Sequence, residues 1–381
     1  MARIAIDARM CAYRRGGIAS YIDNLATALA PELAARGHTF ILGHARRGPP
    51  VLPERAAIHQ PRLWTPPHHP LERHTLLVEF LRARPALLHS PDFVPIIGPW
   101  RTAITVHDLD FVRHPDRLTA DAQRYYGQVA AAVHRAGAII AVSRATRDDL
   151  VSLLGVDAAA VTVIHEAADP LFRPPEASDA GEQTHANRGI PARYFLMVGT
   201  IEPRKNHDTL LDAYAAYRRA ATHPAALVVA GTEGWNAAAT VRRLRTEPGI
   251  LWLGAVTPAA LLPLYHGAMA LLMPSWDEGF GLPVVEAMAS GAPVAISTAH
   301  ALVEIAGDAA LVAAPGDARA WAAAMHRLAD NPSYRAELRA LGERRAARYS
   351  WARAARETAD VYDRLLAKPR GVIGRRRNRA N

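Results

Sequence analysis

Short apolar runs alternate with amphipathic stretches along almost the whole chain, and this alternation limits the possible folds more than any other feature. Residues 3–8 alternate as in a strand, residues 102–106 are rich in β-branched side chains, and residues 20–35 carry apolar side chains at helical spacing. The same alternation begins again at residues 194–198. Strands that alternate with helices form parallel sheets covered by helices. The sequence therefore predicts the α/β class, with two doubly wound parallel sheets.

A polar segment separates the two halves. Pro174 and Pro175 end the first alternation, and residues 176–190 are small and polar, as in a linker. The length of 381 residues suits two ordinary domains. We therefore predict a domain over residues 1–172, a linker over 173–192, a second domain over 193–350, a helix over 351–367 and a disordered tail over 368–381.

The tail carries most of the net charge of +9. Its six basic residues, with no acid among them, are Lys368, Arg370, Arg375, Arg376, Arg377 and Arg379. Such a tail is either solvated or attracted to anionic lipid, and we expect no role in binding nucleic acid. No apolar run is long enough to span a membrane, and the N-terminus reads as a strand and not as a signal peptide. The single cysteine, Cys11, fits a reducing compartment, so we expect a cytoplasmic protein, with peripheral attachment to the inner face of the plasma membrane as the alternative.

Two glutamates flank a glycine-rich turn in the second half. Glu278 precedes the turn Gly279-Phe280-Gly281-Leu282, and Glu286 follows it inside a predicted helix over 283–291. An apolar run over 268–273 predicts a buried strand before the turn. A helix N-terminus offers free N–H groups and a positive dipole end, which suit a phosphate. One carboxylate can then face a sugar and the other a ribose.

A second motif follows the first strand of the second half. It contains Thr200, Arg204 and Lys205. Two fixed cations beside a diphosphate would stabilise the charge that it gains as a leaving group. Lys205 and Lys368 are the two lysines among 45 basic residues, which weakly supports a role that arginine does not fill.

Three places in the first half also fall where ligands bind in such sheets, beyond strand ends. They are a glycine loop with Tyr13, Gly16 and Gly17, a strand end with His107 and Asp108, and a strand end with Ser143. Ser143 is equally explained as a helix N-cap. Asp108 and Asp110 also match an Asp-x-Asp metal motif, but the two-domain layout argues against that interpretation, so we expect no metal site.

Together these motifs resemble glycosyltransferase family 4, whose members are retaining enzymes with the GT-B fold. The resemblance extends from Gly16 to the final helix and includes the Glu-x7-Glu spacing of Glu278 and Glu286. It implies two Rossmann-like domains facing a cleft, with residues 1–172 on the acceptor side, residues 193–350 binding the nucleotide sugar, and the 351–367 helix crossing back to the first domain. The turn at His165-Glu166 departs from the family, where many members carry Asn-Gly.

The resemblance also implies roles for the residues. Glu278 would contact the donor sugar, Glu286 the ribose, and His107 the sugar from across the cleft. The implied catalytic set is His107, Glu278, Arg204 and Lys205. The implied donor-binding set is Gly17, Ser143, Thr200, Arg204, Lys205, Gly279, Phe280, Gly281, Leu282 and Glu286, and the implied acceptor set is Tyr13, Gly16 and Asp108.

The expected function is transfer of a hexose from a nucleotide-diphosphate sugar to a hydroxyl of a glycan or lipid-linked acceptor. The amino-acid sequences of these motifs are similar to those of mannosyltransferases of surface polysaccharide (lipopolysaccharide) assembly. GDP-mannose is therefore favoured over UDP-sugars, with no cofactor or metal. Two alternatives stay open: a nucleotide-sugar epimerase that hydrolyses its donor, and a non-catalytic subunit that binds nucleotide sugar.

Overall fold

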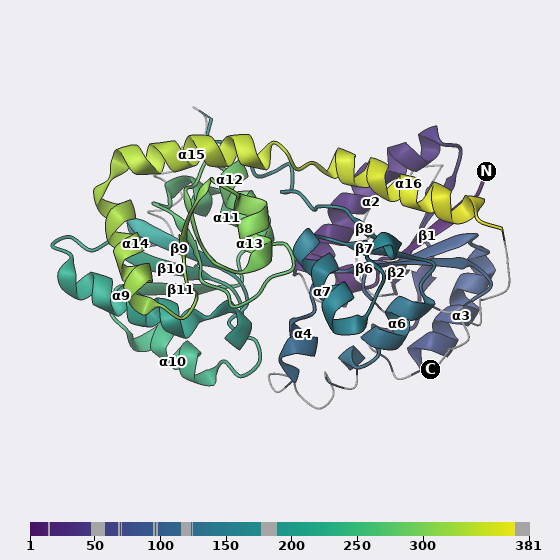
Figure 1. Cartoon of the computed structure of the whole chain (residues 1–381), viewed down its shortest axis with the longest axis horizontal. Helices are drawn as coiled ribbons and strands as arrows, with labels where there is room; N and C mark the ends of the chain where they lie inside the picture. The colour runs from purple at the N-terminus through teal and green to yellow at the C-terminus, as the bar shows by residue number, and fades with distance from the viewer. Residues whose placement is uncertain are drawn as a thin grey trace, which may run out of the picture.

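The chain folds into two parallel β-sheets, each covered by helices (Figure 1). The computed structural model describes residues 1–13, 16–46, 58–67, 69, 71–93, 96, 98–115, 123, 125–176 and 189–369, without the side chains of Tyr13 and Arg73. The α/β class and the two doubly wound sheets are thereby confirmed. The domain boundaries stay a prediction, and residues 370–381 of the basic tail lie outside the described residues.

In the part of the chain that the structure describes, the N-terminal sheet has eight strands in the order β3-β2-β1-β5-β6-β7-β8, with β4 also paired to β2. These strands are β1 (Arg3–Asp7), β2 (Thr39–Ala45), β3 (Ile58–His59), β4 (Arg62–Leu63), β5 (Leu87–Ser90), β6 (Arg101–Val106), β7 (Ala138–Ala141) and β8 (Val161–Val163). Among the described residues, the helices of this half are α1 (Met10–Tyr13), α2 (Gly17–Ala35), α3 (Glu72–Ala83), α4 (Asp110–Arg113), α6 (Val129–Arg135), α7 (Arg144–Leu154) and the 3₁₀ turn η2 (Ala158–Ala160).

The C-terminal sheet has six strands in the order β11-β10-β9-β12-β13-β14. They are β9 (Tyr194–Val198), β10 (Ala226–Ala230), β11 (Ile250–Gly254), β12 (Leu271–Met273), β13 (Val294–Ser297) and β14 (Ala310–Ala313). The helices are η3 (Pro203–Lys205), α9 (His207–Ala220), α10 (Ala238–Thr246), α11 (Pro258–Gly267), α12 (Leu282–Ala289), α13 (His300–Ala306), α14 (Ala318–Asp330), α15 (Pro332–Ala346) and α16 (Trp351–Ala367). The strand order reverses between β9 and β12, and ligands of such sheets bind beyond the strand ends at this point.

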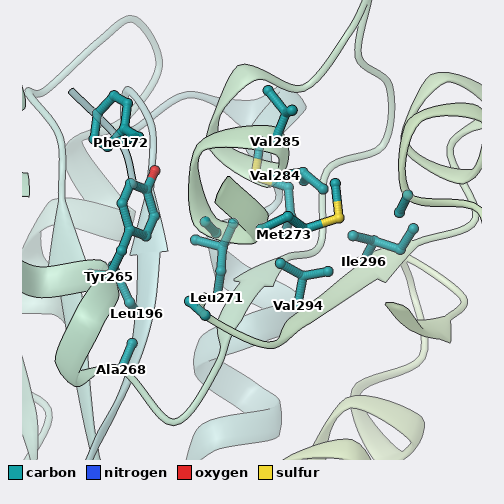
Figure 2. Packing of buried hydrophobic residues seen from close by; sticks show 14 of the residues in the cluster. Phe172, Leu196, Tyr265, Ala268, Leu271, Met273, Val284, Val285, Val294 and Ile296 are labelled. Carbon is teal, nitrogen blue, oxygen red and sulfur yellow. The ribbon is translucent and has the colours of Figure 1, made fainter. Parts of the chain in front are cut away.

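A buried apolar cluster holds both flanks of the glutamate-containing turn. Leu271 and Met273 on β12 and Val284 and Val285 on α12 are all fully buried (Figure 2). Burial of each such side chain contributes roughly 1.5–3 kcal/mol. The turn over residues 274–281 is therefore anchored on both sides, which fixes the position of the carboxylate that it carries.

The last helix lies in the other half of the molecule. Figure 1 shows α16 along α2, at the opposite end of the molecule from α14. Trp351 and Tyr362 on α16 share a buried cluster with Ile4 and Leu29 of the first half. The chain is not helical across residues 347–350, where Ser350 caps α16 by accepting a hydrogen bond from the N–H of Arg353. Among the described residues, no helix is both long enough and apolar enough to cross a membrane.

Candidate active site

A buried ion cluster forms where β9 and β12 end. Lys205 Nζ and Ser275 Oγ donate to Glu278 Oε1 over 2.6 and 2.7 Å, and Arg204 Nη1 donates to Glu278 Oε2 over 2.7 Å. Burial alone would raise the pKa of Glu278, but the charges of Lys205 and Arg204 and the hydrogen bonds lower the pKa to about 2. Glu278 is therefore a fixed carboxylate at neutral pH, and the two cations are held together by it.

The two loops that carry these charges are pinned to each other. Asn206 has a left-handed backbone (φ 57°), and its side-chain amide donates to the carbonyls of Pro274 and Pro315 over 2.9 and 2.6 Å. The N–H of Trp276 donates to the carbonyl of Arg204 over 2.9 Å. Asparagine tolerates the left-handed region better than most residues. These bonds fix the cations relative to Glu278 before any ligand binds.

A second carboxylate approaches the same arginine. Glu202 Oε1 lies 3.0 Å from Arg204 Nη2, although this contact lacks hydrogen-bond geometry and Oε1 is buried without a hydrogen-bond partner. Burial raises the pKa of Glu202, and Arg204 and Lys205 offset part of that rise. With Glu202 ionised, Arg204 and Lys205 face Glu202 and Glu278, and the four charges sum to zero.

The turn after Glu278 meets the N-terminal half directly. A Cβ at Gly279 would lie 1.7 Å from the carbonyl oxygen of His107, so this position accommodates no side chain without a shift. Thr146 Oγ1 donates to the carbonyls of His107 and Gly279 over 3.1 and 3.3 Å, and Ser143 caps α7 by accepting from the N–H of Thr146. The N-cap interpretation of Ser143 is confirmed. Gly281 is the N-cap of α12, with φ 92°, in the left-handed region that glycine occupies readily.

Both ring nitrogens of His107 have oxygen partners. Nδ1 lies 3.1 Å from Glu166 Oε1, and Nε2 lies 2.9 Å from the carbonyl oxygen of Pro91. The rings of Tyr21 and His107 are nearly perpendicular, with 4.8 Å between their centroids. Burial alone would lower the pKa of His107, but the hydrogen bond and charge of Glu166 outweigh it and raise the pKa.

Glu286 lies on α12 in a different environment. The hydroxyl of Tyr265 donates to Glu286 Oε2 over 3.0 Å. Burial raises the pKa of Glu286 to about 7, the Tyr265 hydrogen bond opposes this rise, and the charges of Asp169 and Glu166 add to it. Glu286 therefore takes up a proton at a much higher pH than Glu278 does.

The structure thus brings several predicted site residues together and leaves others apart. Arg204, Lys205 and Glu278 form one cluster. At its edge, the Cβ of Asp108 lies 3.2 Å from a Cβ built at Gly279. Five further predicted residues lie around these elements. Gly16 occupies the N-cap position of α2, a Cβ built at Gly17 would lie 3.9 Å from Leu282 Cδ1, the Thr200 methyl packs toward Gly234, and Phe280 packs against His165. The side chain of Tyr13 lies outside the described residues. The substrate roles of all these residues stay predictions.

The sequence analysis missed five polar side chains that contact the predicted residues, namely Thr146, Glu166, Glu202, Tyr265 and Ser275. Ser275 stands three residues before Glu278, a spacing that could have indicated it. Glu166 stands in the turn where the sequence departs from the family pattern. Among the described residues, no group of three or more His, Cys, Asp or Glu side chains is arranged to hold a metal ion.

Comparisons with known proteins cover both halves. The family model described as "Glycosyltransferase Family 4" matches residues 15–170, and the model "Glycosyl transferases group 1" matches residues 192–331. The chain is 30% identical over 283 residues to O-antigen chain mannosyltransferase B of Escherichia coli, which covers 73% of this chain and 74% of that protein. It is 28% identical over 403 residues to D-inositol 3-phosphate glycosyltransferase of Kineococcus radiotolerans, with 92% and 91% covered. Sucrose-phosphate synthase from Thermosynechococcus elongatus has a similar fold, with a TM-score of 0.77, 21% identity, and 96% and 100% covered.

Proposed function

This chain belongs to glycosyltransferase family 4, and we propose on that basis that it is a retaining enzyme that transfers a hexose, with mannose favoured. The donor would be a nucleotide-diphosphate sugar, and the acceptor a hydroxyl of a glycan or of a lipid-linked glycan. The mannose preference is supported by the name of the Escherichia coli relative, which makes GDP-mannose the first donor to test. By the same argument the product would belong to a surface polysaccharide.

The observation that carries this proposal is the convergence of Arg204 and Lys205 on the buried Glu278. A diphosphate that leaves a sugar gains negative charge, and fixed cations stabilise that charge without reorganisation. The proposal therefore assigns charge neutralisation to Arg204 and Lys205 and needs no metal ion. Glu278 would exchange its cation partners for the donor sugar when the diphosphate binds, and Glu286 would contact the ribose.

We propose same-face attack as the route to retention. The acceptor oxygen forms the new bond to the anomeric carbon while the bond from that carbon to the diphosphate oxygen breaks. The acceptor proton passes to the departing phosphate oxygen, which keeps atoms and charges balanced. In support, the low pKa of Glu278 makes it a weak base. We further propose a cytoplasmic enzyme whose basic tail from Lys368 contacts the anionic inner face of the plasma membrane.

The test is product analysis with purified enzyme, a panel of nucleotide sugars, and glycan acceptors. The proposal expects a glycoside whose anomeric configuration matches the donor, formed faster with GDP-mannose than with UDP-glucose. Free or epimerised sugar formed at the same rate without acceptor would identify a hydrolysing epimerase instead. Donor binding without any turnover would identify a binding subunit. Lys205→Ala should abolish most turnover, and Lys368→Ala is the matched control because Lys368 is the other lysine of the chain.

A further inference from the structure

The two contacts of the His107 ring restrict its protonation state. Pro91 contributes a carbonyl oxygen to Nε2, and Glu166 contributes a carboxylate oxygen to Nδ1. A carbonyl and an ionised carboxylate only accept hydrogen bonds. A neutral imidazole has one N–H and one lone pair, so one of the two contacts would place a lone pair against an oxygen. Both contacts are satisfied together when both ring nitrogens carry a proton.

We propose that Glu166 is a positioning residue that holds the His107 ring as an imidazolium, so that His107 presents a fixed positive charge to the bound donor. The inference rests on the proposed function, because the donor diphosphate is the anion expected at the contact between His107 and the turn after Glu278. An imidazolium has no lone pair, so His107 in this state cannot act as a base. Its charge would act on the leaving diphosphate together with Arg204 and Lys205.

The position of Glu166 suits this role. Its side chain is 4% exposed, against 17% for His107, so the pair is largely shielded from water. Charges interact more strongly in such surroundings than at the surface. Glu166 lies three residues beyond the end of β8, in the turn where the sequence departs from the family pattern. This departure is the sequence feature that the proposed function leaves unexplained, and the contact with His107 explains it.

The other groups around His107 do not oppose the charge. From α2, Tyr21 presents a neutral ring whose hydroxyl is hydrogen-bonded to Thr105 over 2.9 Å. From β5, His89 is hydrogen-bonded to Thr105 over 2.8 Å, and burial with the charge of His107 lowers the pKa of His89 to about 3. Asp92, beyond the end of β5, adds negative charge. His89 thus stays neutral, and of these two histidines His107 is the one that carries the second ring proton.

The neighbouring residue provides a matched control. His165 Nε2 lies 2.7 Å from Glu304 Oε1, a second histidine–glutamate pair that joins the two halves of the chain. Replacing Glu304 removes a carboxylate from a histidine of the same turn without touching His107. Glu166→Gln is the test variant because its amide can donate to Nδ1 while Nε2–H still donates to Pro91. The ring can therefore stay in place and lose only its charge.

The experiment is a nitrogen NMR titration of histidine-labelled protein, with the His107 signals assigned by their loss in His107→Gln. We expect both nitrogens of wild-type His107 to be protonated at pH 7. In Glu166→Gln the proton affinity should fall at least about tenfold, or one pKa unit, with only Nε2 protonated. Glu166→Asp should restore part of the affinity, and it replaces the Gln variant if that variant does not fold. Glu304→Gln should move the His165 signals and leave those of His107 unchanged.

Three results would overturn the inference. The first is a neutral wild-type ring at pH 7, and the second is a ring that stays doubly protonated in Glu166→Gln. The third concerns turnover. In Glu166→Gln, kcat should fall by about tenfold or more, with a smaller change in donor KM. An unchanged kcat in a variant whose His107 ring is neutral would show that the charge of His107 does not contribute to the reaction. Absence of turnover in wild type with every nucleotide sugar, beside the expected NMR result, would instead refute the proposed function and leave the pair intact.

Discussion

Replacing Glu278 by glutamine should lower the folding stability of the ligand-free protein and strengthen its binding of a nucleoside diphosphate. In the ligand-free structure the Glu278 carboxylate occupies both Lys205 and Arg204. A diphosphate that uses the same cations has to displace it. Glu278→Gln keeps the shape of the side chain and removes its charge, so the cations lose their internal partner and become available to GDP.

The pKa of Glu278 gives the size of the effect. It falls from 4.5 to about 2, a difference of about 2.5 units, which corresponds to about 3 kcal/mol. Because the folded-state pKa is lowered, this stabilisation is complete above pH 4.5 and is lost as the pH falls through about 2. The side chain is 6% exposed, so solvent screening removes little of it. At pH 7 we expect Glu278→Gln to lower the free energy of unfolding by about 3 kcal/mol, as for other broken buried ion pairs.

The assay is urea denaturation of the wild type and the variant, each with and without GDP, together with calorimetric titration of GDP. The gain in stability with GDP should be larger for Glu278→Gln, since the diphosphate replaces the missing carboxylate. Turnover should fall, because the contact with the donor sugar is lost. Glu286→Gln is the contrasting variant. It removes a carboxylate that Tyr265 contacts and that has no cation among its described contacts, so it should not strengthen the binding of GDP. Unchanged stability together with weaker GDP binding in Glu278→Gln would refute the reasoning.

Four further predictions concern single features. Lys205→Ala should weaken GDP binding by about 1.5–3 kcal/mol in calorimetry, with Lys368→Ala as the unaffected control. Equal affinities of the wild type and Lys205→Ala for GDP would show that Lys205 does not bind the phosphates. The pKa of Glu286 is raised to about 7, so wild type should lose stability as the pH rises from 4.5 through 7 while Glu286→Gln does not; parallel curves would contradict this. Gly279→Ala should enlarge the radius of gyration in X-ray scattering, because its Cβ meets a carbonyl of the other half at 1.7 Å, and an unchanged radius would show that the contact adapts. Deleting residues 369–381 should reduce binding to anionic vesicles without changing turnover on a soluble acceptor, and equal vesicle binding at low salt would refute the lipid role.

Much of the fold was predictable because it depends on local pattern. The residues of β9 and β12 are short apolar runs followed by charged or glycine-rich turns, and such runs indicate strands without knowledge of their neighbours. Parallel strands place their carboxyl ends at one edge, so the Arg204 and Glu278 motifs were expected in one region. The sequence did not reveal that β9 and β12 are adjacent in the sheet. Because they are adjacent, Lys205 and Arg204 come close enough to Glu278 to form hydrogen bonds of 2.6 and 2.7 Å.

The missed residues depend on contacts between distant parts of the chain. Glu166 meets His107 across 59 positions, and Glu304 meets His165 across 139. No periodicity or spacing encodes such pairs, since they arise only after strands of a sheet are ordered and the two halves meet. Glu166 could be noticed as a departure from the family pattern, but its partner could not be named without the structure.

Arg204, Lys205 and, in its proposed imidazolium state, His107 each face a carboxylate, so the ligand-free site is balanced and not simply positive. Lys205 has Glu278, Arg204 has Glu278 and Glu202, and His107 has Glu166. A site with unpaired cations would bind the ground-state diphosphate tightly, and tight uniform binding lowers KM without raising kcat. When each cation is already paired with a carboxylate, the phosphate of the bound donor only replaces one anion by another. The net gain in binding free energy is then the difference between the two interactions. The departing diphosphate carries more charge than the bound donor, so that difference grows along the reaction, and the paired carboxylates favour turnover over product retention.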